Sequence, residues 1–465
     1  MKKRVIFIVV TALLCCLLVA CGSKTRLQAP QNIRQNGPFL IWDEVENAEG
    51  YIVLADNEEY VTAEPSCNLS FLGGETVYVV KIKAVGDGEN FADSDWSEFG
   101  FNEIFKYTLL ADGSGYEVNL SVSSVELQDR KVVVPSTYEN LPVTRIADKM
   151  FYKCASLTEV VLPNTLKEIG ANAFYNCKAL TSIDLPSSVT AIGSGAFSGC
   201  SSLKKLIVPT GIEQIENLTF EGCTSLTEIV LPNTLKEIGV DAFYNCKALT
   251  SIELPESVTA IGPSAFMHCS SLKKIVVPTG IERIESNMFN DCTSLTEVVL
   301  PSMLKEIRGM AFFGCIALEN IELPASVTAI GSIAFGGCSS LKKIVVPTGV
   351  ERIEGSTFVG CSNLTEVVLP STLKEIMGMA FRNCEALKTV VLPSSLKDIG
   401  KGAFSNCPLE SVFFGGTEAE YLSVSVAEGN DSILSAAVYF YSETEPTENP
   451  QKFWRYSGGK PLPWA

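Results

Sequence analysis

Cysteine is the residue whose spacing most clearly suggests chemistry in this chain of 465 residues. One cysteine recurs every 23 residues from Cys154 to Cys407, twelve times without a slip. Cysteines in such an array could form disulfides, hold a metal ion or act as nucleophiles beside a general base. The single histidine, His268, lies directly before Cys269 and would be the base of such a pair.

The neighbours of these cysteines favour a structural role. A phenylalanine precedes each of them by three residues, from Phe151 to Phe404, so the thiol repeats as a small apolar side chain beside a large one. No zinc-type cysteine or histidine cluster occurs within a unit, and His268 fills a slot occupied elsewhere by Gly, Asn, Lys or Asp. We therefore expect buried thiols, no metal and no cofactor. Stacked disulfides remain the alternative, because equivalent Cα atoms of stacked coils lie within disulfide range.

A fixed period in the twenties is typical of a solenoid, in which each repeat is one coil stacked on its neighbours. In the unit 180–200, apolar residues alternate with polar ones up to Pro186, which ends a short strand because it lacks an N–H group. Gly193 then permits a turn, and Ala196 and Phe197 face the core. The prolines keep the same period from Pro163 to Pro393. The repeat region therefore predicts a mainly β array.

This pattern resembles the BspA-type leucine-rich repeat of bacterial surface proteins, across roughly residues 130 to 415. The resemblance implies a leucine-rich repeat solenoid with 23-residue coils and caps at both ends. Residues 100–135 would form the N-terminal cap, 136–407 the array, and 408–465 the C-terminal cap and tail. It also implies a non-catalytic adhesion or recognition module.

The N-terminus resembles the signal peptide of a bacterial lipoprotein. Lys2, Lys3 and Arg4 precede an apolar stretch of 16 residues, which is short for a membrane-spanning helix of about 20. The run ends in Leu-Val-Ala-Cys at Cys21. The resemblance implies that residues 1–20 are removed, that Cys21 is lipidated, and that residues 21–26 tether the chain outside the cytoplasm to the bacterial membrane or surface. An ordinary signal peptide or an uncleaved anchor are the alternatives.

Residues 27–99 carry strand-like runs separated by Gly, Asn, Asp and Pro, which predict an all-β module. The order of Trp42, Tyr51, Tyr78 and a closing Asp-Trp-Ser resembles a fibronectin type III β-sandwich, and the resemblance implies that Trp42, Tyr51 and Tyr78 are core residues. An acidic loop around Asp87 could bind Ca²⁺, but it lacks the ligand spacing of a dedicated calcium loop. A solvated loop is favoured.

Charge and composition exclude several functions. The formal net charge of −17 argues against nucleic acid, and against a membrane contact other than the lipid anchor. With one histidine and no grouping of acid, base and nucleophile, we expect no enzyme activity. We expect a monomer whose partner is a protein or glycan at a cell surface.

A second period of 69 residues, three units long, places opposite charges in neighbouring coils. Equivalent positions of adjacent strands lie side by side. This spacing predicts that a lysine or arginine faces a glutamate at these junctions. The predicted pairs are Lys205 with Glu228, Lys274 with Glu297, Lys343 with Glu366, Glu213 with Lys236, Glu282 with Lys305, Glu351 with Lys374, Arg283 with Glu306, and Arg352 with Glu375.

The exposed strand positions mix these charges with valines, and in repeat proteins such a face is the usual binding surface. We expect a protein partner to bind there. A carbohydrate-binding or cell-envelope scaffold protein is the alternative, and a merely solvated sheet is the simplest one. The candidate residues are Lys204, Lys205, Glu228, Val230, Glu253, Lys273, Lys274, Val276, Glu297, Val299, Glu322, Lys342 and Lys343.

Overall fold

The computed structural model describes residues 24–36, 39–55, 58–68, 79–100, 105–121 and 131–464. Contacts divide these residues into two units, one built mainly from residues up to Phe99 and one from Gly100 onward. The predicted signal peptide, the predicted lipidation site Cys21 and the predicted core residue Tyr78 lie outside the described residues.

The smaller unit is made of β-strands. They are β1 (Thr25–Arg26), β2 (Arg34–Asn36), β3 (Phe39–Ile41), β4 (Gly50–Ala55), β5 (Glu58–Thr62), β6 (Ser66–Asn68), β7 (Val79–Val85), β8 (Phe91–Ala92) and β9 (Ser97–Gly100). Its larger sheets have the orders β5-β4-β7-β9 and β2-β3-β6, and β1 pairs with β8. Strand β1 therefore begins inside the segment expected to be a tether. Trp42 and Tyr51 are buried, with ring centroids 5.2 Å apart.

The acidic loop around Asp87 is held by hydrogen bonds among its own residues. The carboxylate of Asp87 accepts hydrogen bonds from the amides of Phe91, Glu89 and Asn90, and the bond from Phe91 does most to lower its pKa to about 2. The charge of Asp87 therefore stabilises the loop through hydrogen bonds to its own backbone. Within the described residues, no group of three or more His, Cys, Asp or Glu could hold a metal ion.

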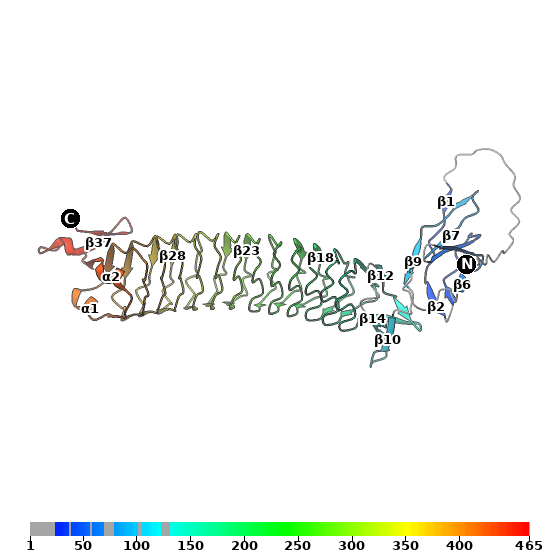
Figure 1. Cartoon of the computed structure of the whole chain (residues 1–465), viewed down its shortest axis with the longest axis horizontal. Helices are drawn as coiled ribbons and strands as arrows, with labels where there is room; N and C mark the ends of the chain where they lie inside the picture. Colours follow the sequence, from blue (N-terminus) through cyan, green and yellow to red (C-terminus); the bar gives the residue numbers. More distant parts are fainter. Residues whose placement is uncertain are drawn as a thin grey trace, which may run out of the picture. The chain divides into compact units, whose positions relative to one another are not determined.

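The larger unit is a stack of coils, and each coil has three sides. Figure 1 shows the stack, with β12, β18, β23 and β28 labelled along it. The long-strand side carries β12 (Lys131–Val133), β15 (Glu159–Val161), β18 (Lys205–Ile207), β20 (Glu228–Val230), β23 (Lys274–Val276), β25 (Glu297–Val299), β28 (Lys343–Val345), β30 (Glu366–Val368), β32 (Thr389–Leu392) and β34 (Ser411–Phe414). Successive strands are parallel, as β18 and β20 show by pairing Lys205 with Glu228.

The short-strand side is the second side of each coil. It carries β14 (Leu141–Ile146), β16 (Glu168–Ile169), β17 (Ala191–Ile192), β19 (Gln214–Ile215), β21 (Glu237–Ile238), β22 (Ala260–Ile261), β24 (Arg283–Ile284), β26 (Glu306–Ile307), β27 (Ala329–Ile330), β29 (Arg352–Ile353), β31 (Glu375–Ile376), β33 (Asp398–Ile399) and β35 (Ser425–Val426). The turn side, which holds the phenylalanine and leads to the cysteine, closes the coil.

On the turn side, backbone hydrogen bonds join each coil to the next. Each phenylalanine amide from Phe151 to Phe381 donates to the carbonyl 22 residues ahead, at 2.7–3.0 Å. The residues two before and two after it donate to the next coil in the same way. These two flanking residues have positive φ, as His268 at 61° does. The left-handed backbone directs three hydrogen bonds per junction along the stack.

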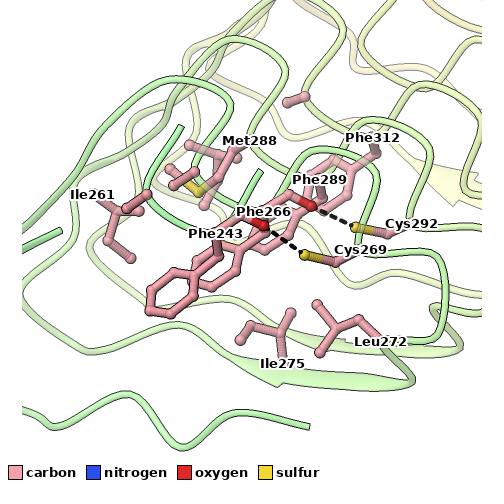
Figure 2. Close-up of a cluster of buried hydrophobic side chains, with 14 of the residues drawn as sticks. Phe243, Ile261, Phe266, Cys269, Leu272, Ile275, Met288, Phe289, Cys292 and Phe312 are labelled. Atoms are coloured by element: carbon pink, nitrogen blue, oxygen red, sulfur yellow. Dashed lines mark hydrogen bonds between the residues drawn. The ribbon is translucent and has the colours of Figure 1, made fainter. Parts of the chain in front are cut away.

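Phenylalanine and cysteine fill the core behind the turn side (Figure 2). The twelve phenylalanine rings from Phe151 to Phe404 form one stack with centroids 5.1–5.8 Å apart. The twelve column cysteines are buried free thiols. From Cys177 to Cys407, each thiol donates to the phenylalanine carbonyl of the preceding coil, as Cys269 does to Phe243 at 3.2 Å. The prediction of buried thiols is confirmed.

The two strand ladders are interrupted once every three coils. On the long-strand side the pairing stops after β15, β20, β25 and β30. On the short-strand side it stops after β17, β22 and β27, at different junctions. At most other junctions on that side a hydroxyl bridges the coils, as Ser257 does by donating to the Leu235 carbonyl at 2.6 Å. Met303 stands at this position in the coil of β26, which still pairs with β24. The coils beyond the breaks carry Gly211, Gly280 or Gly349 at this position and lack that bridge.

Caps cover both ends of the array. At the N-terminal end β10 (Phe105–Leu109) and β11 (Tyr116–Leu120) form an antiparallel hairpin, and β13 (Thr137–Tyr138) pairs with β14. The C-terminal elements are α1 (Glu418–Leu422), α2 (Asp431–Ser435), β36 (Ala437–Tyr441), the 3₁₀-helix η2 (Pro450–Lys452), β37 (Phe453–Ser457) and β38 (Lys460–Pro463). Trp454 is buried and donates to the Phe414 carbonyl at 2.9 Å, so it packs on the array.

Candidate partner-binding face

The exposed side chains of the long-strand side define one face, which we call the long-strand face. Within a strand such as β18, Leu206 points into the core while Lys205 and Ile207 point outward, because successive side chains of a strand alternate. All thirteen candidate residues are exposed. They form columns along the array, since the strands are parallel and in register.

The three charge pairs predicted on this face are all formed. The lysine Nζ and glutamate Oε1 atoms lie 2.7 Å apart for Lys205 and Glu228, 2.7 Å for Lys274 and Glu297, and 2.6 Å for Lys343 and Glu366. Each side chain stays about half exposed, so one pair contributes about 0 to 1 kcal/mol to stability. The opposite charges of each pair are consistent with the register of the parallel strands.

The pairs predicted on the short-strand side are formed only in part. Glu282 with Lys305, Glu351 with Lys374, and Arg352 with Glu375 are ion pairs. Arg283 lies beside Glu306 in the strand register but forms no ion pair with it within the described residues.

Arg308 explains the failed pair. Its guanidinium lies 3.5 Å from the Glu306 carboxylate and 2.8 Å from that of Glu285, and it takes the place of Arg283. The predicted pair of Glu213 and Lys236 is also absent from the described part of the chain, and nothing in the structure explains it.

Sequence reasoning did not predict every ion pair on the long-strand side; Lys131 with Glu159, Lys342 with Glu319 and Lys388 with Glu410 are further examples. Lys342 lies 2.6 Å from Glu319, which stands where the two preceding three-coil blocks have Thr250 and Thr181. That exchange of threonine for glutamate is the signal in the sequence. Lys342 is therefore neutralised, whereas its equivalents Lys273 and Lys204 form no ion pair with any other described residue.

Unpaired charges therefore recur along the face. Within the described residues, Asp184, Glu253 and Glu322 also lack an ion-pair partner. Between them lie exposed apolar residues in adjacent coils, such as Ile207 with Val230 and Val276 with Val299. A block of two apolar rows and one unpaired carboxylate repeats every three coils, or about 14 Å at a strand spacing of about 4.8 Å. The first two blocks also carry an unpaired lysine, Lys204 or Lys273.

Burial makes most of the column thiols, including Cys269, unsuited to nucleophilic chemistry. Burial raises the pKa of the Cys154 thiol to about 11 and the pKa of Cys200, Cys269 and Cys361 to about 12. The thiolate is the nucleophile and the metal ligand, and these groups stay protonated at neutral pH. Cys269 therefore cannot act as a nucleophile beside His268, whose imidazole Nδ1 instead lies 3.4 Å from Asp291 Oδ2.

Sequence reasoning missed a groove on the short-strand side. It has a volume of about 680 Å³ and lies where the ladder stops between β27 and β29. Charged side chains line it, including Glu306, Arg308, Glu351 and Arg352. Gly349 is a sequence signal for it, because most coils carry a bridging Ser or Thr at this position.

Comparison with known proteins gives a family match over most of the array. The model of the BspA type leucine rich repeat region matches residues 144–273, 200–319, 259–385 and 305–425. No curated protein matches the chain.

Solved structures of bacterial leucine-rich repeat proteins are similar to this chain. A leucine-rich repeat protein from Bacteroides ovatus has 28% identity and a TM-score of 0.48, covering 73% of this chain and 94% of that one. A leucine rich cell surface protein from Faecalibacterium prausnitzii has 25% identity and a TM-score of 0.43, covering 69% and 96%. The leucine rich repeat protein of T. pallidum has 29% identity and a TM-score of 0.34, covering 51% and 88%. None of the described helices is long and apolar enough to cross a bilayer.

Proposed function

Because the chain belongs to the BspA-type leucine-rich repeat family, we propose that it is a bacterial cell-surface protein that recognises a protein partner and catalyses no reaction. The observation that carries this proposal is the long-strand face, on which exposed apolar rows lie between unpaired charges. Repeat arrays commonly bind macromolecules across such extended faces.

The side chains of the long-strand face indicate what kind of surface the partner should present. Apolar rows such as Ile207 with Val230 would lose water against apolar side chains of the partner, which favours binding. Lys204 and Glu253 would fix its position, because charges that lack an internal partner gain most from an opposite charge. The partner should therefore present both signs of charge around apolar residues.

The test is to reverse the two unpaired lysines. The double variant Lys204→Glu and Lys273→Glu leaves every ion pair on the face intact, so its stability should match that of the native chain. We expect it to lose at least tenfold in affinity for a partner captured from cell-surface protein fractions, measured by surface plasmon resonance.

The matched control reverses two exposed, unpaired lysines on the short-strand side, Lys236→Glu and Lys397→Glu. It makes the same change in net charge and should bind as the native chain does. Equal binding by the Lys204 and Lys273 variant and by this control would rule out the long-strand face as the site.

We propose in addition that Cys21 carries a lipid that holds the chain at the bacterial membrane or surface. The support is the basic and apolar N-terminal run that ends at this cysteine. Cys21→Ser should move the protein from the membrane fraction to the soluble fraction, together with loss of labelling by a radioactive fatty acid. Labelling that persists in this variant would disprove the assignment.

We also propose that the smaller unit is a fibronectin type III module. Two larger sheets, β5-β4-β7-β9 and β2-β3-β6, support this, as does the burial of Trp42 against Tyr51. Such a module should unfold separately from the array. Trp42→Ala should then lower the midpoint temperature of one calorimetric transition, that of the smaller unit, and leave the midpoint of the array unchanged. A shift of both midpoints would contradict the proposal.

A further inference from the structure

A shallow pocket of about 470 Å³ opens on the turn side. It spans three consecutive coils and contains the chain's single histidine. The side chains that matter for its chemistry are those of Tyr244, Asn245, Lys247, His268, Ser270 and Asp291.

His268 is held between two neighbours. Its ring lies edge-on to the Tyr244 ring, with centroids 5.3 Å apart and planes at 75°. Its Nδ1 lies 3.4 Å from Asp291 Oδ2, and the two side chains remain 33% and 38% exposed. The side chains of Tyr244, Asn245 and Lys247 form no hydrogen bond or ion pair with other described residues. The pocket thus offers aromatic surface and several unsatisfied hydrogen-bonding groups.

The neighbouring three-coil blocks lack this arrangement. The residues 69 positions before and after His268 are Gly199 and Gly337, and those equivalent to Asp291 are Gly222 and Gly360.

Backbone conformation makes the two replacements notable. The four glycines have φ of 68–72°, and His268 and Asp291 keep the left-handed conformation at 61° and 55°. An L-residue with a side chain is strained in that conformation, whereas glycine is not.

A third exchange fits the other two. Gly314 follows Asp291 in the next coil, where the equivalent positions of the neighbouring blocks are Asn245 and Asn383. A Cβ atom at Gly314 would collide with the Asp291 carboxylate. Histidine, aspartate and the glycine that makes room for the carboxylate therefore occur together in one block.

We propose that this pocket binds one pyranose ring of a glycan. The faces and edges of Tyr244 and His268 supply aromatic surface for the C–H groups of a sugar. The Asp291 carboxylate, the Asn245 amide and the Lys247 ammonium group can bond neighbouring hydroxyls, and charged partners make the stronger bonds. Concave aromatic surface with a few convergent polar groups is the usual composition of a small-ligand site. This site is independent of the protein partner proposed for the long-strand face.

The experiment measures binding of the full chain to immobilised pyranosides and short oligosaccharides, including neutral, N-acetylated and uronic acid members. We expect at least one probe to be retained. The double variant His268→Gly and Asp291→Gly should weaken that binding at least tenfold, with an equal or higher melting temperature because glycine relieves the strain. Absence of binding to every probe, or unchanged binding by this variant, would overturn the proposal.

The matched control is Asn383→Gly. Asn383 belongs to the same column, with φ of 62°, but lies outside the pocket. Its replacement should leave the affinity unchanged. A loss equal to that of the double variant would show that the effect is not local, and would also overturn the proposal.

A transplant tests whether these side chains suffice. The first block already holds Tyr175, Asn176 and Lys178 at the equivalent positions. In the background of the double variant, Gly199→His, Gly222→Asp and Asn245→Gly should rebuild the pocket three coils earlier. Binding of the same probe should return, and a folded transplant without binding would contradict the assignment of the site to these groups.

Discussion

The turn side and the long-strand side of the array differ in how firmly they join the coils. On the turn side every junction from Phe151 to Phe381 has three backbone hydrogen bonds, a stacked ring pair and a buried cysteine. On the long-strand side the pairing stops after β15, β20, β25 and β30. The first side keeps one pattern in all coils, and the second varies with a period of three.

This difference separates two roles within each coil. The turn side repeats strictly because every ring and thiol contacts its equivalents above and below, so one altered coil would disturb two junctions. The long-strand face carries side chains directed at solvent, and changes there affect stability little. The face is therefore free to vary for recognition.

The largest expected effect comes from removing one ring of the stack. Phe266→Ala should lower the free energy of unfolding by about 3–5 kcal/mol, because it leaves a cavity between Phe243 and Phe289. Val276→Ala on the long-strand face should change it by less than about 0.5 kcal/mol. Denaturant unfolding of both variants measures the contrast, and similar losses would refute it.

The next effect is a loss of stability at alkaline pH. Burial raises the pKa of the Cys269 thiol from an ordinary value near 9 to about 12, so the folded chain keeps a proton that the unfolded chain releases. Stability is full below pH 9 and falls as the pH rises toward 12, by up to about 1.4 kcal/mol per pH unit for each such thiol.

Thermal melting between pH 7 and 11 measures this fall. Native protein treated with a thiol reagent at pH 8 should react first at the half-buried Cys67, and at the column only after unfolding. Rapid modification of Cys269 in the folded chain would show that the column is open to solvent.

A smaller effect is expected from one thiol. Cys269→Ala removes a buried sulfur and its hydrogen bond to the Phe243 carbonyl, at 3.2 Å, and should cost about 1–2 kcal/mol. Cys67→Ala in the smaller unit is the control. We expect Cys269→Ala to lower the denaturation midpoint of the array and Cys67→Ala to leave it unchanged. The opposite result would contradict a stabilising role of the column thiol.

The smallest effect concerns the charge pairs. Lys274→Glu places like charges opposite Glu297 and should lower stability by about 1 kcal/mol or less, because both side chains are half exposed. Adding Glu297→Lys should restore it. A double-mutant cycle measures the coupling, and the absence of any coupling at low salt would show that the pair does not help to set the register.

The sequence predicted the parts of the fold that repeat. The spacing of Phe and Cys gives the coil length, and the 69-residue cycle gives the Lys205 pair with Glu228. The sequence did not predict that Arg308 would take Glu306 from Arg283, because side-chain reach between columns depends on geometry. It also could not show that the thiols bond to phenylalanine carbonyls, since that bond involves a backbone atom.

The histidine pocket shows what sequence reasoning can overlook. His268 looked like an ordinary occupant of a variable slot. Its significance depends on Asp291 one coil later, on Gly314 in the coil after that, and on the left-handed backbone of that column. The sequence holds the signal, as paired exchanges for glycine, but only the structure shows that their side chains meet.

Hydrogen exchange of backbone amides tests the central claim most directly, namely that the turn side holds the coils together. The amides of Phe243, Phe266 and Phe289 should exchange most slowly, because their bonds continue through every junction. The amide of Ser251, just beyond the break after β20, should exchange far faster. Equal or stronger protection at Ser251 would contradict the account.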